Sequence, residues 1–149
     1  MKLLVLDLDG TLWDHEDASV LVPPSEFRGN CLIDSTGQEL CLFHGVREFL
    51  DWASERFVLS IASWNLEDKV RCILEGFGLW DYFLFPKIEG HPNKADMIRR
   101  TLDELSSIGY NIEESFTWIT EIFTSMRLGG YFPQLTLCTC GWMRNLLKN

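Results

Sequence analysis

The chain has 149 residues, of which 46% are hydrophobic, and a formal net charge of −9. This length and apolar content predict a single domain over residues 1–149 with its own core. The negative charge argues against nucleic acid or an anionic membrane as the main partner, because both attract basic surfaces. The N-terminal apolar run is too short for a signal peptide or a membrane span, so we expect a cytoplasmic location.

The first predicted element is a strand over residues 2–7, where the sequence KLLVLD resembles a strand buried on both faces of a sheet. Asp7 and Asp9 lie two residues apart at its carboxyl end, where parallel sheets place their ligands. Two carboxylates this close are costly unless a cation neutralises them, and all-oxygen ligation favours Mg²⁺. Alternatively, these residues and Gly10 simply end the strand in a metal-free turn.

A polar insertion over about residues 14–43 follows, and it predicts a small cap. Within it, residues 31–41 are typical of a hairpin around a Ser-Thr-Gly turn. Cys31 and Cys41 could face each other across this hairpin, but reduced cysteine is the commoner state in a cytosolic enzyme, so we expect free thiols.

The rest of the chain alternates between helices and strands. Helices are predicted over residues 45–56, 67–77 and 94–107, and strands over residues 57–62, 82–85 and 116–119. Such alternation favours an α/β fold, with a doubly wound, Rossmann-like parallel sheet and the small hairpin cap as an insertion.

Residues 7–12, DLDGTL, resemble the first motif of the haloacid dehalogenase superfamily of phosphotransferases. The resemblance implies that Asp7 attacks phosphorus and becomes an aspartyl phosphate. It also implies that Asp9 protonates the leaving oxygen and then activates the water that hydrolyses the intermediate. The second Asp favours a phosphatase over a dehalogenase, which lacks it.

Two further motif positions follow in the expected order. Ser63, after the second predicted strand, matches the residue that hydrogen-bonds the transferred phosphoryl group. Lys94, at the start of the last predicted helix, matches the lysine that holds the nucleophile and the phosphate together. Without the first motif, Ser63 would be an ordinary helix cap and Lys94 an ordinary solvated side chain.

The short cap and the residues beside the motifs indicate the substrate class. A lone hairpin leaves the site open to bulky phosphorylated partners. Trp13 directly after the first motif, the Pro23-Pro24 pair, the pattern over residues 34–37 and Ala62-Ser63 before a turn together resemble the magnesium-dependent phosphatase group of the superfamily. That resemblance implies Mg²⁺ as cofactor and phosphotyrosine-like or sugar-phosphate-type substrates, whether a phosphorylated small molecule or a phosphoprotein. A phosphomutase is less expected, because such enzymes usually carry a larger cap. The candidate substrate-binding residues are Thr11, Trp13, Trp64 and Asn65.

The fourth motif departs from the family pattern. The family places one or two Asp after a strand to complete the metal site, whereas here residues 116–119 are followed by Thr120 and Glu121. Glu121 is therefore the candidate third ligand, beside Asp7 and the backbone carbonyl of Asp9. Mg²⁺ requires a tight octahedral arrangement and tolerates a displaced ligand poorly. The alternative is a non-catalytic binding domain or a relic with a defective metal site.

The chain changes character from about Ser115 onward, and residues 115–149 show no helical or family-like pattern. Trp118 has a single codon and every codon for Ile119 begins with AT, so the triplet spanning their junction encodes Asp. That frame can encode an Asp-rich fourth motif. The hypothesis is that a reading-frame shift near Ser115 has replaced the native tail, and the coding DNA tests it.

Overall fold

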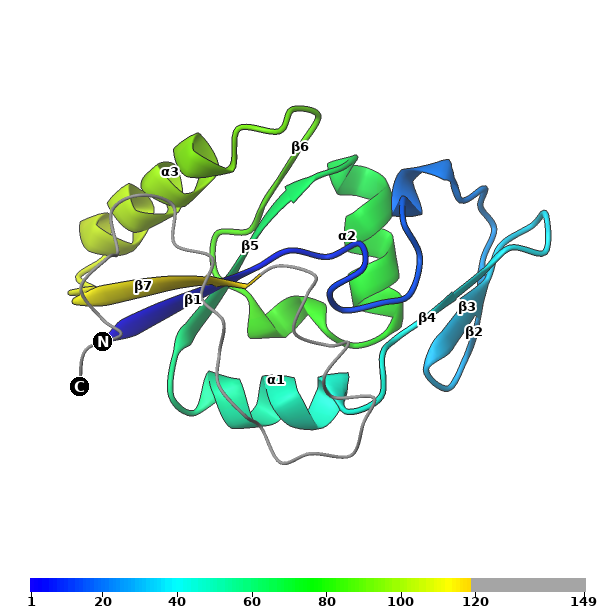
Figure 1. Cartoon of the computed structure of the whole chain (residues 1–149), viewed down its shortest axis with the longest axis horizontal. Helices are drawn as coiled ribbons and strands as arrows, with labels where there is room; N and C mark the ends of the chain where they lie inside the picture. The colour runs from blue at the N-terminus through cyan, green and yellow to red at the C-terminus, as the bar shows by residue number, and fades with distance from the viewer. Residues whose placement is uncertain (119–149) are drawn as a thin grey trace.

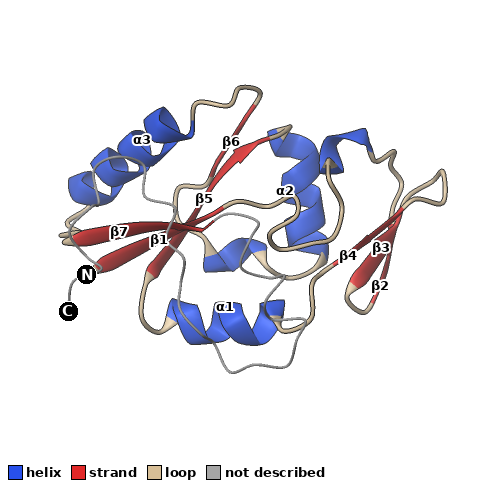
Figure 2. Ribbon diagram, in the orientation of Figure 1, coloured by secondary structure: helices blue, strands red, loops and turns tan. Residues whose placement is uncertain are grey.

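The computed structural model describes residues 1–118 (Figure 1). In this part of the chain, four strands form a parallel sheet in the order β6-β5-β1-β7. The strands are β1 (Lys2–Leu6), β5 (Val58–Trp64), β6 (Lys87–Glu89) and β7 (Glu114–Trp118), and the α-helices are α1 (Val46–Ser54), α2 (Glu67–Gly76) and α3 (Lys94–Ser107). Figure 2 shows how strands and helices alternate, which confirms the α/β class.

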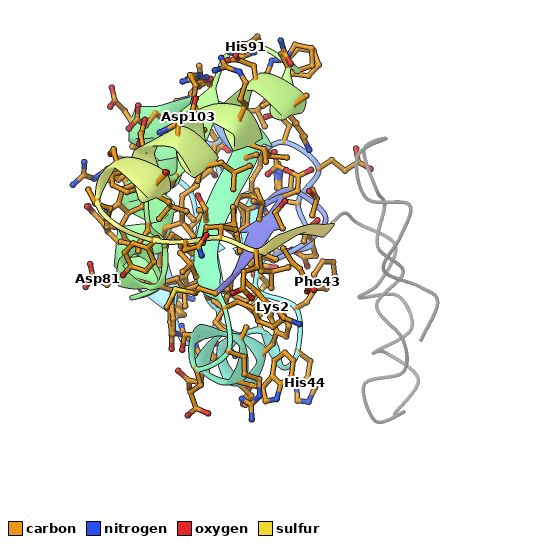
Figure 3. All side chains as sticks on the ribbon, turned by 90° about the vertical axis from the view of Figure 1, so that its left-hand side faces the viewer. Lys2, Phe43, His44, Asp81, His91 and Asp103 are labelled. Carbon is orange, nitrogen blue, oxygen red and sulfur yellow. A yellow bond between two sulfur atoms is a disulfide. The ribbon has the colours of Figure 1, made fainter. Side chains whose placement is uncertain are left out.

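Strand β1 is buried on both faces, as its apolar run predicts. Leu4 and Leu6 belong to the hydrophobic cluster that includes the buried residues of α1 and α2. Leu3 and Val5, which alternate with them, belong to a second cluster with α3. Helices therefore pack on both faces of the sheet, and Figure 3 shows α3, marked by Asp103, on the opposite side from α1.

The position of β1 in the sheet determines where a ligand can bind. It pairs with β5 on one side and with β7 on the other, and both neighbours run parallel to it. The chain passes from β1 to β5 and β6 on one side of the sheet and then returns through α3 to β7 on the other side. The connections therefore diverge at the carboxyl ends of the central strands. In Figure 1 the carboxyl end of β1 points toward the cap.

The cap is a three-stranded antiparallel sheet of β2 (Glu26–Arg28), β3 (Cys31–Ile33) and β4 (Glu39–Cys41), preceded by the 3₁₀-helix η1 (Ala18–Val20). Its β3–β4 hairpin confirms the one predicted over residues 31–41. Gly37 in the turn has φ 89°, a conformation that favours glycine. Strand β2 was not predicted, because all three of its residues are exposed and show no apolar alternation.

The expectation of free thiols in the cap is wrong. Cys31 and Cys41 occupy facing positions of β3 and β4 and form a disulfide, with their Cα atoms 4.0 Å apart. Directly opposed residues on antiparallel strands bring their Cβ atoms close together, which allows this bond. In the described part of the chain, Cys72 is a free cysteine and is exposed.

The side chain of Asp34 organises the turns of the cap, and it is only 5% exposed. Its Oδ2 accepts a hydrogen bond from the backbone of Val22 (2.8 Å). Its Oδ1 accepts from the backbone and hydroxyl of Thr36 and from the backbone of Gln38 (2.9, 2.7 and 2.8 Å). Burial alone would raise the pKa of Asp34, but these hydrogen bonds together lower it to about 2.

Side chains of the core and the cap hold the cap against α1 and α2. The Phe27 ring packs edge-on against Phe77 with centroids 5.0 Å apart, and it lies where a Cβ on Gly76 would be. Arg47 of α1 donates to Asn30 Oδ1 and to the Phe77 carbonyl, at 2.8 Å each. The cap is thus packed onto the core by both apolar and polar contacts.

The prediction of a strand over residues 82–85 is wrong. The 3₁₀-helix η2 (Trp80–Tyr82) occupies its start, and β6 begins only after Pro86. Phe83 is apolar because it is buried in the core, not because it belongs to an extended strand, although it makes one isolated bridge. Strand β6 escaped prediction because Ile88 is its single buried residue, between a Lys and a Glu.

The remaining predicted elements agree closely with the structure. Helix α3 has the bounds expected for it, α2 ends one residue early, and β7 begins two residues before the predicted strand. Within residues 1–118, no helix is long and apolar enough to cross a membrane. Ile119, Glu121 and nearly all of the anomalous tail lie outside the described residues.

Candidate active site

A tight turn after β1 presents the two carboxylates of the first motif. Gly10 has φ 69°, which favours glycine, and the Leu8 carbonyl accepts backbone hydrogen bonds from both Thr11 and Leu12 at 2.9 Å. The chain therefore reverses directly after the strand. Asp7 and Asp9 are both partly buried, at the carboxyl edge of the central strand.

Asp7 and Lys94 are in direct contact although 87 positions separate them in the sequence. Lys94 Nζ lies 2.5 Å from Asp7 Oδ2, and Asp7 Oδ1 accepts from the backbone N–H of Leu8 at 2.8 Å. The two side chains are 28% and 16% exposed, respectively. Lys94 is the first residue of α3, whose N-cap Asn93 accepts a hydrogen bond from the backbone of Asp96. The capped helix start therefore places the ammonium group beside the nucleophile candidate.

Three donors hold the carboxylate of Asp9. Its Oδ1 accepts from the Trp13 indole at 2.7 Å and from the backbone N–H of Ala18 at 3.1 Å. Its Oδ2 accepts from Asn65 Nδ2 at 2.8 Å. Trp13 and Asn65, both expected to bind substrate, thus contact the candidate acid–base residue. Their role as substrate ligands stays a prediction.

The surroundings of Asp9 shift its pKa upward. Burial is the largest cause, because it disfavours the charged carboxylate. The hydrogen bonds from Trp13 and Ala18 act in the opposite direction, while the charges of Asp17 and Asp7 raise the pKa further. A carboxyl group with a raised pKa is suited to carry a proton at moderately acidic pH.

The other candidate residues differ widely in exposure. Ser63 is 1% exposed near the end of β5, two residues after Ile61, the partner of Leu6 in β1, so it lies at the same sheet edge as Asp7. Trp64 is 61% exposed and is available to a ligand. Thr11 is fully buried, and its hydroxyl has no hydrogen-bond partner among residues 1–118.

The metal site predicted from the sequence lies only partly within the described residues. No group of three Asp, Glu, His or Cys side chains that could hold a metal occurs in residues 1–118. Mg²⁺, however, often binds one or two carboxylates and completes its shell with water and substrate phosphate. The two hard oxygen donors of the DLDG turn, the Asp7 carboxylate and the Asp9 carbonyl, fit that chemistry. Glu121, the predicted third ligand, lies outside the described residues.

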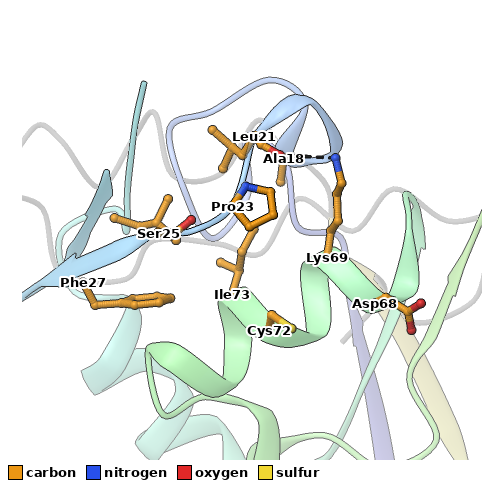
Figure 4. Close-up of a pocket in the computed structure, with 10 residues that line it drawn as sticks. Ala18, Leu21, Pro23, Ser25, Phe27, Asp68, Lys69, Cys72 and Ile73 are labelled. Carbon is orange, nitrogen blue, oxygen red and sulfur yellow. Dashed lines mark hydrogen bonds between the residues drawn. The ribbon is translucent and has the colours of Figure 1, made fainter. Parts of the chain in front are cut away.

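A separate hollow of about 340 Å³ lies between the cap and α2 (Figure 4). Its lining is mainly apolar and includes Leu21, Phe27 and Ile73. Lys69, also at its rim, donates to the backbone carbonyls of Ser19 and Leu21 at 2.6 and 3.2 Å. None of the candidate catalytic residues lines this hollow, so it is distinct from the carboxylate site.

Sequence reasoning missed the contacts around Asp9. The spacing of Asp9 and Trp13 across a glycine turn was a usable signal, because four residues suffice for the chain to fold back. No sequence signal connects Asn65 with Asp9, since 56 positions separate them. The backbone N–H of Ala18 carries no side-chain signal at all.

Comparison with known proteins agrees with the first motif. The acid phosphatase family model matches residues 1–73, a span that includes Asp7, Asp9 and Ser63 and ends in α2, before Lys94. No curated protein matches the chain. The family match confirms the resemblance to the haloacid dehalogenase superfamily, because this acid phosphatase family is of that type. It supports phosphatase activity in general, and hence a phosphorylated substrate.

Proposed function

We propose that this chain, whose residues 1–73 match the acid phosphatase family, is a Mg²⁺-dependent phosphomonoester hydrolase. The observation that carries the proposal is the contact between Lys94 and Asp7. Lys94 lies beyond the matched residues, yet its ammonium group reaches the nucleophile candidate, as phosphoryl transfer requires. Helices on both faces of the parallel sheet further support a doubly wound, Rossmann-like fold.

The proposed reaction has two steps. An Asp7 carboxylate oxygen attacks phosphorus, and the bond from phosphorus to the leaving oxygen breaks as Asp9 gives that oxygen a proton. Asp9 then takes a proton from water, whose oxygen attacks the aspartyl phosphate and releases inorganic phosphate. Ser63 and Lys94 hold the phosphoryl oxygens throughout, and both aspartates return to their initial states.

The Asp7 carboxylate and the Asp9 backbone carbonyl would hold Mg²⁺, and Glu121 remains the candidate third ligand. When bound, the ion offsets the negative charge shared by the nucleophile and the phosphoryl group. The donor chemistry of these oxygens supports Mg²⁺ over softer metals.

The proposed substrates are phosphotyrosine-like or sugar-phosphate-type monoesters, in a small molecule or a phosphoprotein. The small cap supports this choice, because a cap of this size leaves the site open to bulky phosphorylated partners. The cap is packed against α1 and α2 beside the site. Trp64, exposed next to Ser63, offers a flat apolar surface for the leaving group.

Hydrolysis of p-nitrophenyl phosphate with Mg²⁺ tests the proposal. We expect Asp7→Asn to lower kcat by at least about 10³-fold while the circular dichroism spectrum stays unchanged. Asp103→Asn, the same change at an exposed site on α3, is the control and keeps the wild-type rate. Near-wild-type turnover by Asp7→Asn would exclude Asp7 as the nucleophile.

A non-catalytic binding domain is the second candidate, because Thr120 and Glu121 stand where the family pattern places Asp. Thermal denaturation with and without Mg²⁺ separates the two, because a ligand that binds only the folded state raises Tm. A Mg²⁺-dependent rise that Asp7→Asn abolishes supports the phosphatase. If Mg²⁺ does not raise Tm and no turnover is measured, the result supports the non-catalytic binding domain.

A further inference from the structure

The hydrogen bonds on Asp9 occupy its two carboxyl oxygens unequally. A carboxylate offers about two acceptor positions on each oxygen. Oδ1 accepts two N–H groups, from Trp13 and Ala18, so both of its positions are taken. Oδ2 accepts one N–H group, from Asn65, in the described part of the chain. One position on Oδ2 is left for a proton.

We infer that Trp13 and Asn65 are positioning residues that lock the carboxyl group of Asp9 so that Oδ2 is the oxygen that carries the transferred proton. This inference rests on the proposed phosphatase function. A proton on Oδ1 would face two N–H donors and displace at least one of them, whereas a proton on Oδ2 leaves all three hydrogen bonds intact.

Both holding side chains are themselves fixed. Trp13 is fully buried and forms a bridge with Leu42 of the cap connection. Asn65 is 4% exposed; its backbone N–H donates to the Glu89 carbonyl at 2.9 Å, and its Oδ1 accepts from the backbone of Leu66 at 3.0 Å. Because the indole has a single N–H donor and Asp9 uses it, Trp13 has no hydrogen bond to offer a substrate.

In the first step, the Oδ2 proton moves to the leaving oxygen as that oxygen's bond to phosphorus breaks. Oδ1 keeps its two hydrogen bonds throughout, so the carboxyl group does not rotate. Rotation would bring Oδ1, which carries no proton, to the leaving oxygen. Correct orientation therefore matters most for substrates whose leaving oxygen needs a proton.

The test compares kcat/KM for two substrates, because kcat/KM reports the steps up to formation of the aspartyl phosphate. An alkyl phosphate needs protonation of its leaving group, whereas p-nitrophenyl phosphate has a good leaving group and needs little. We expect Trp13→Phe and Asn65→Asp to lower kcat/KM for the alkyl phosphate by about 10- to 100-fold. The loss with p-nitrophenyl phosphate should be at most about 3-fold.

Each variant removes one donor to Asp9, and Asn65→Asp also places a negative charge beside its Oδ2. Trp13→Phe keeps an aromatic ring, and Asn65→Asp keeps the oxygen that accepts from Leu66. The controls make the same changes away from the site: Trp52→Phe on α1 and Asn30→Asp in the cap, where the new carboxylate still accepts from Arg47. Both controls should keep the wild-type ratio between the substrates. Equal losses with both substrates in both site variants would reveal a merely structural role and overturn the inference.

A second measurement is independent of turnover. In ¹⁵N-labelled protein, Trp13→Phe identifies the Trp13 indole signal among the six tryptophans. Asp9→Asn replaces the charged acceptor by a neutral one, so this signal should move upfield more than any other indole signal. The absence of such a shift would overturn the inference. If the wild type hydrolyses neither substrate, the proposed function fails, while the shifted indole still supports the arrangement of hydrogen bonds.

Discussion

The contact between Lys94 and Asp7 can be measured as a coupling energy, without any assay of catalysis. The perturbations are Asp7→Asn, Lys94→Met and the double variant. Exposed ion pairs contribute at most about 1 kcal/mol, whereas breaking a buried pair costs about 3–5 kcal/mol. These side chains are 16% and 28% exposed with Nζ and Oδ2 2.5 Å apart, which lies between the two cases. We therefore expect a coupling energy of about 1–3 kcal/mol.

The assay is urea denaturation of the four proteins in a buffer with a chelator, so that bound metal does not compete with Lys94 for Asp7. The control cycle uses Arg99 and Asp103 on α3, which are 62% and 70% exposed and 3.2 Å apart. Its coupling energy should be about 0.3–0.5 kcal/mol, as for exposed helix pairs.

Additivity would refute the reasoning. If the changes in the free energy of unfolding caused by the two single substitutions sum to the change in the double variant within about 0.5 kcal/mol, the two groups do not interact. The approach of α3 to the carboxyl end of β1 would then be wrong, and with it the main support for the proposed phosphatase.

Three further predictions concern the cap. Asp34→Asn should lower Tm at neutral pH, because it removes the carboxylate that accepts the hydrogen bonds of the cap turns. The folded-state pKa of Asp34, about 2, lies below its unfolded value of about 3.9, so the difference in Tm between variant and wild type should vanish as the pH falls from about 4 to about 2. A difference in Tm that persists in acid would contradict this prediction. Phe27→Ala should lower the free energy of unfolding by about 1–2 kcal/mol in urea denaturation, because it removes a ring that packs edge-on against Phe77. An unchanged denaturation midpoint would show that the ring contributes nothing. Reduction of the disulfide should cost about 2–3 kcal/mol, as expected for a loop with a separation of 10 residues; Cys31→Ser with Cys41→Ser should make Tm insensitive to the reductant, and a reductant-sensitive Tm in that double variant would contradict the assignment.

The elements predicted well from the sequence are those whose burial determines their composition. Strand β1 has an apolar residue at every buried position, and α3 combines a capping Asn93 with apolar residues at helical spacing. Strands β2 and β6 lack that signal, because β2 is exposed and β6 buries only Ile88. Short strands with polar residues are defined by their partners, which a single sequence does not identify.

The candidate site divides in a similar way. Asp7, Asp9, Ser63 and Lys94 were recognisable as a motif series, since their order along the chain follows the family pattern. The hydrogen bonds from Trp13 and Asn65 to Asp9 depend on side-chain placement across the turn and across β5, which only the folded chain shows. The disulfide of the cap needed the register of β3 and β4, because spacing alone allows both free and bonded cysteines.

The two hydrophobic clusters on opposite faces of the sheet support different residues of the candidate site. Lys94 belongs to α3, which packs against one cluster, whereas Trp13, which holds Asp9, is part of the other. Lys94, which contacts Asp7, and Trp13, which holds Asp9, are therefore supported by separate layers on the two faces of the central strands. A cavity introduced under α3 would displace Lys94 and leave Asp9 in register, while one under α1 or α2 would do the reverse. The alignment of Lys94 with Asp9 thus depends on how rigidly β1 joins the two layers.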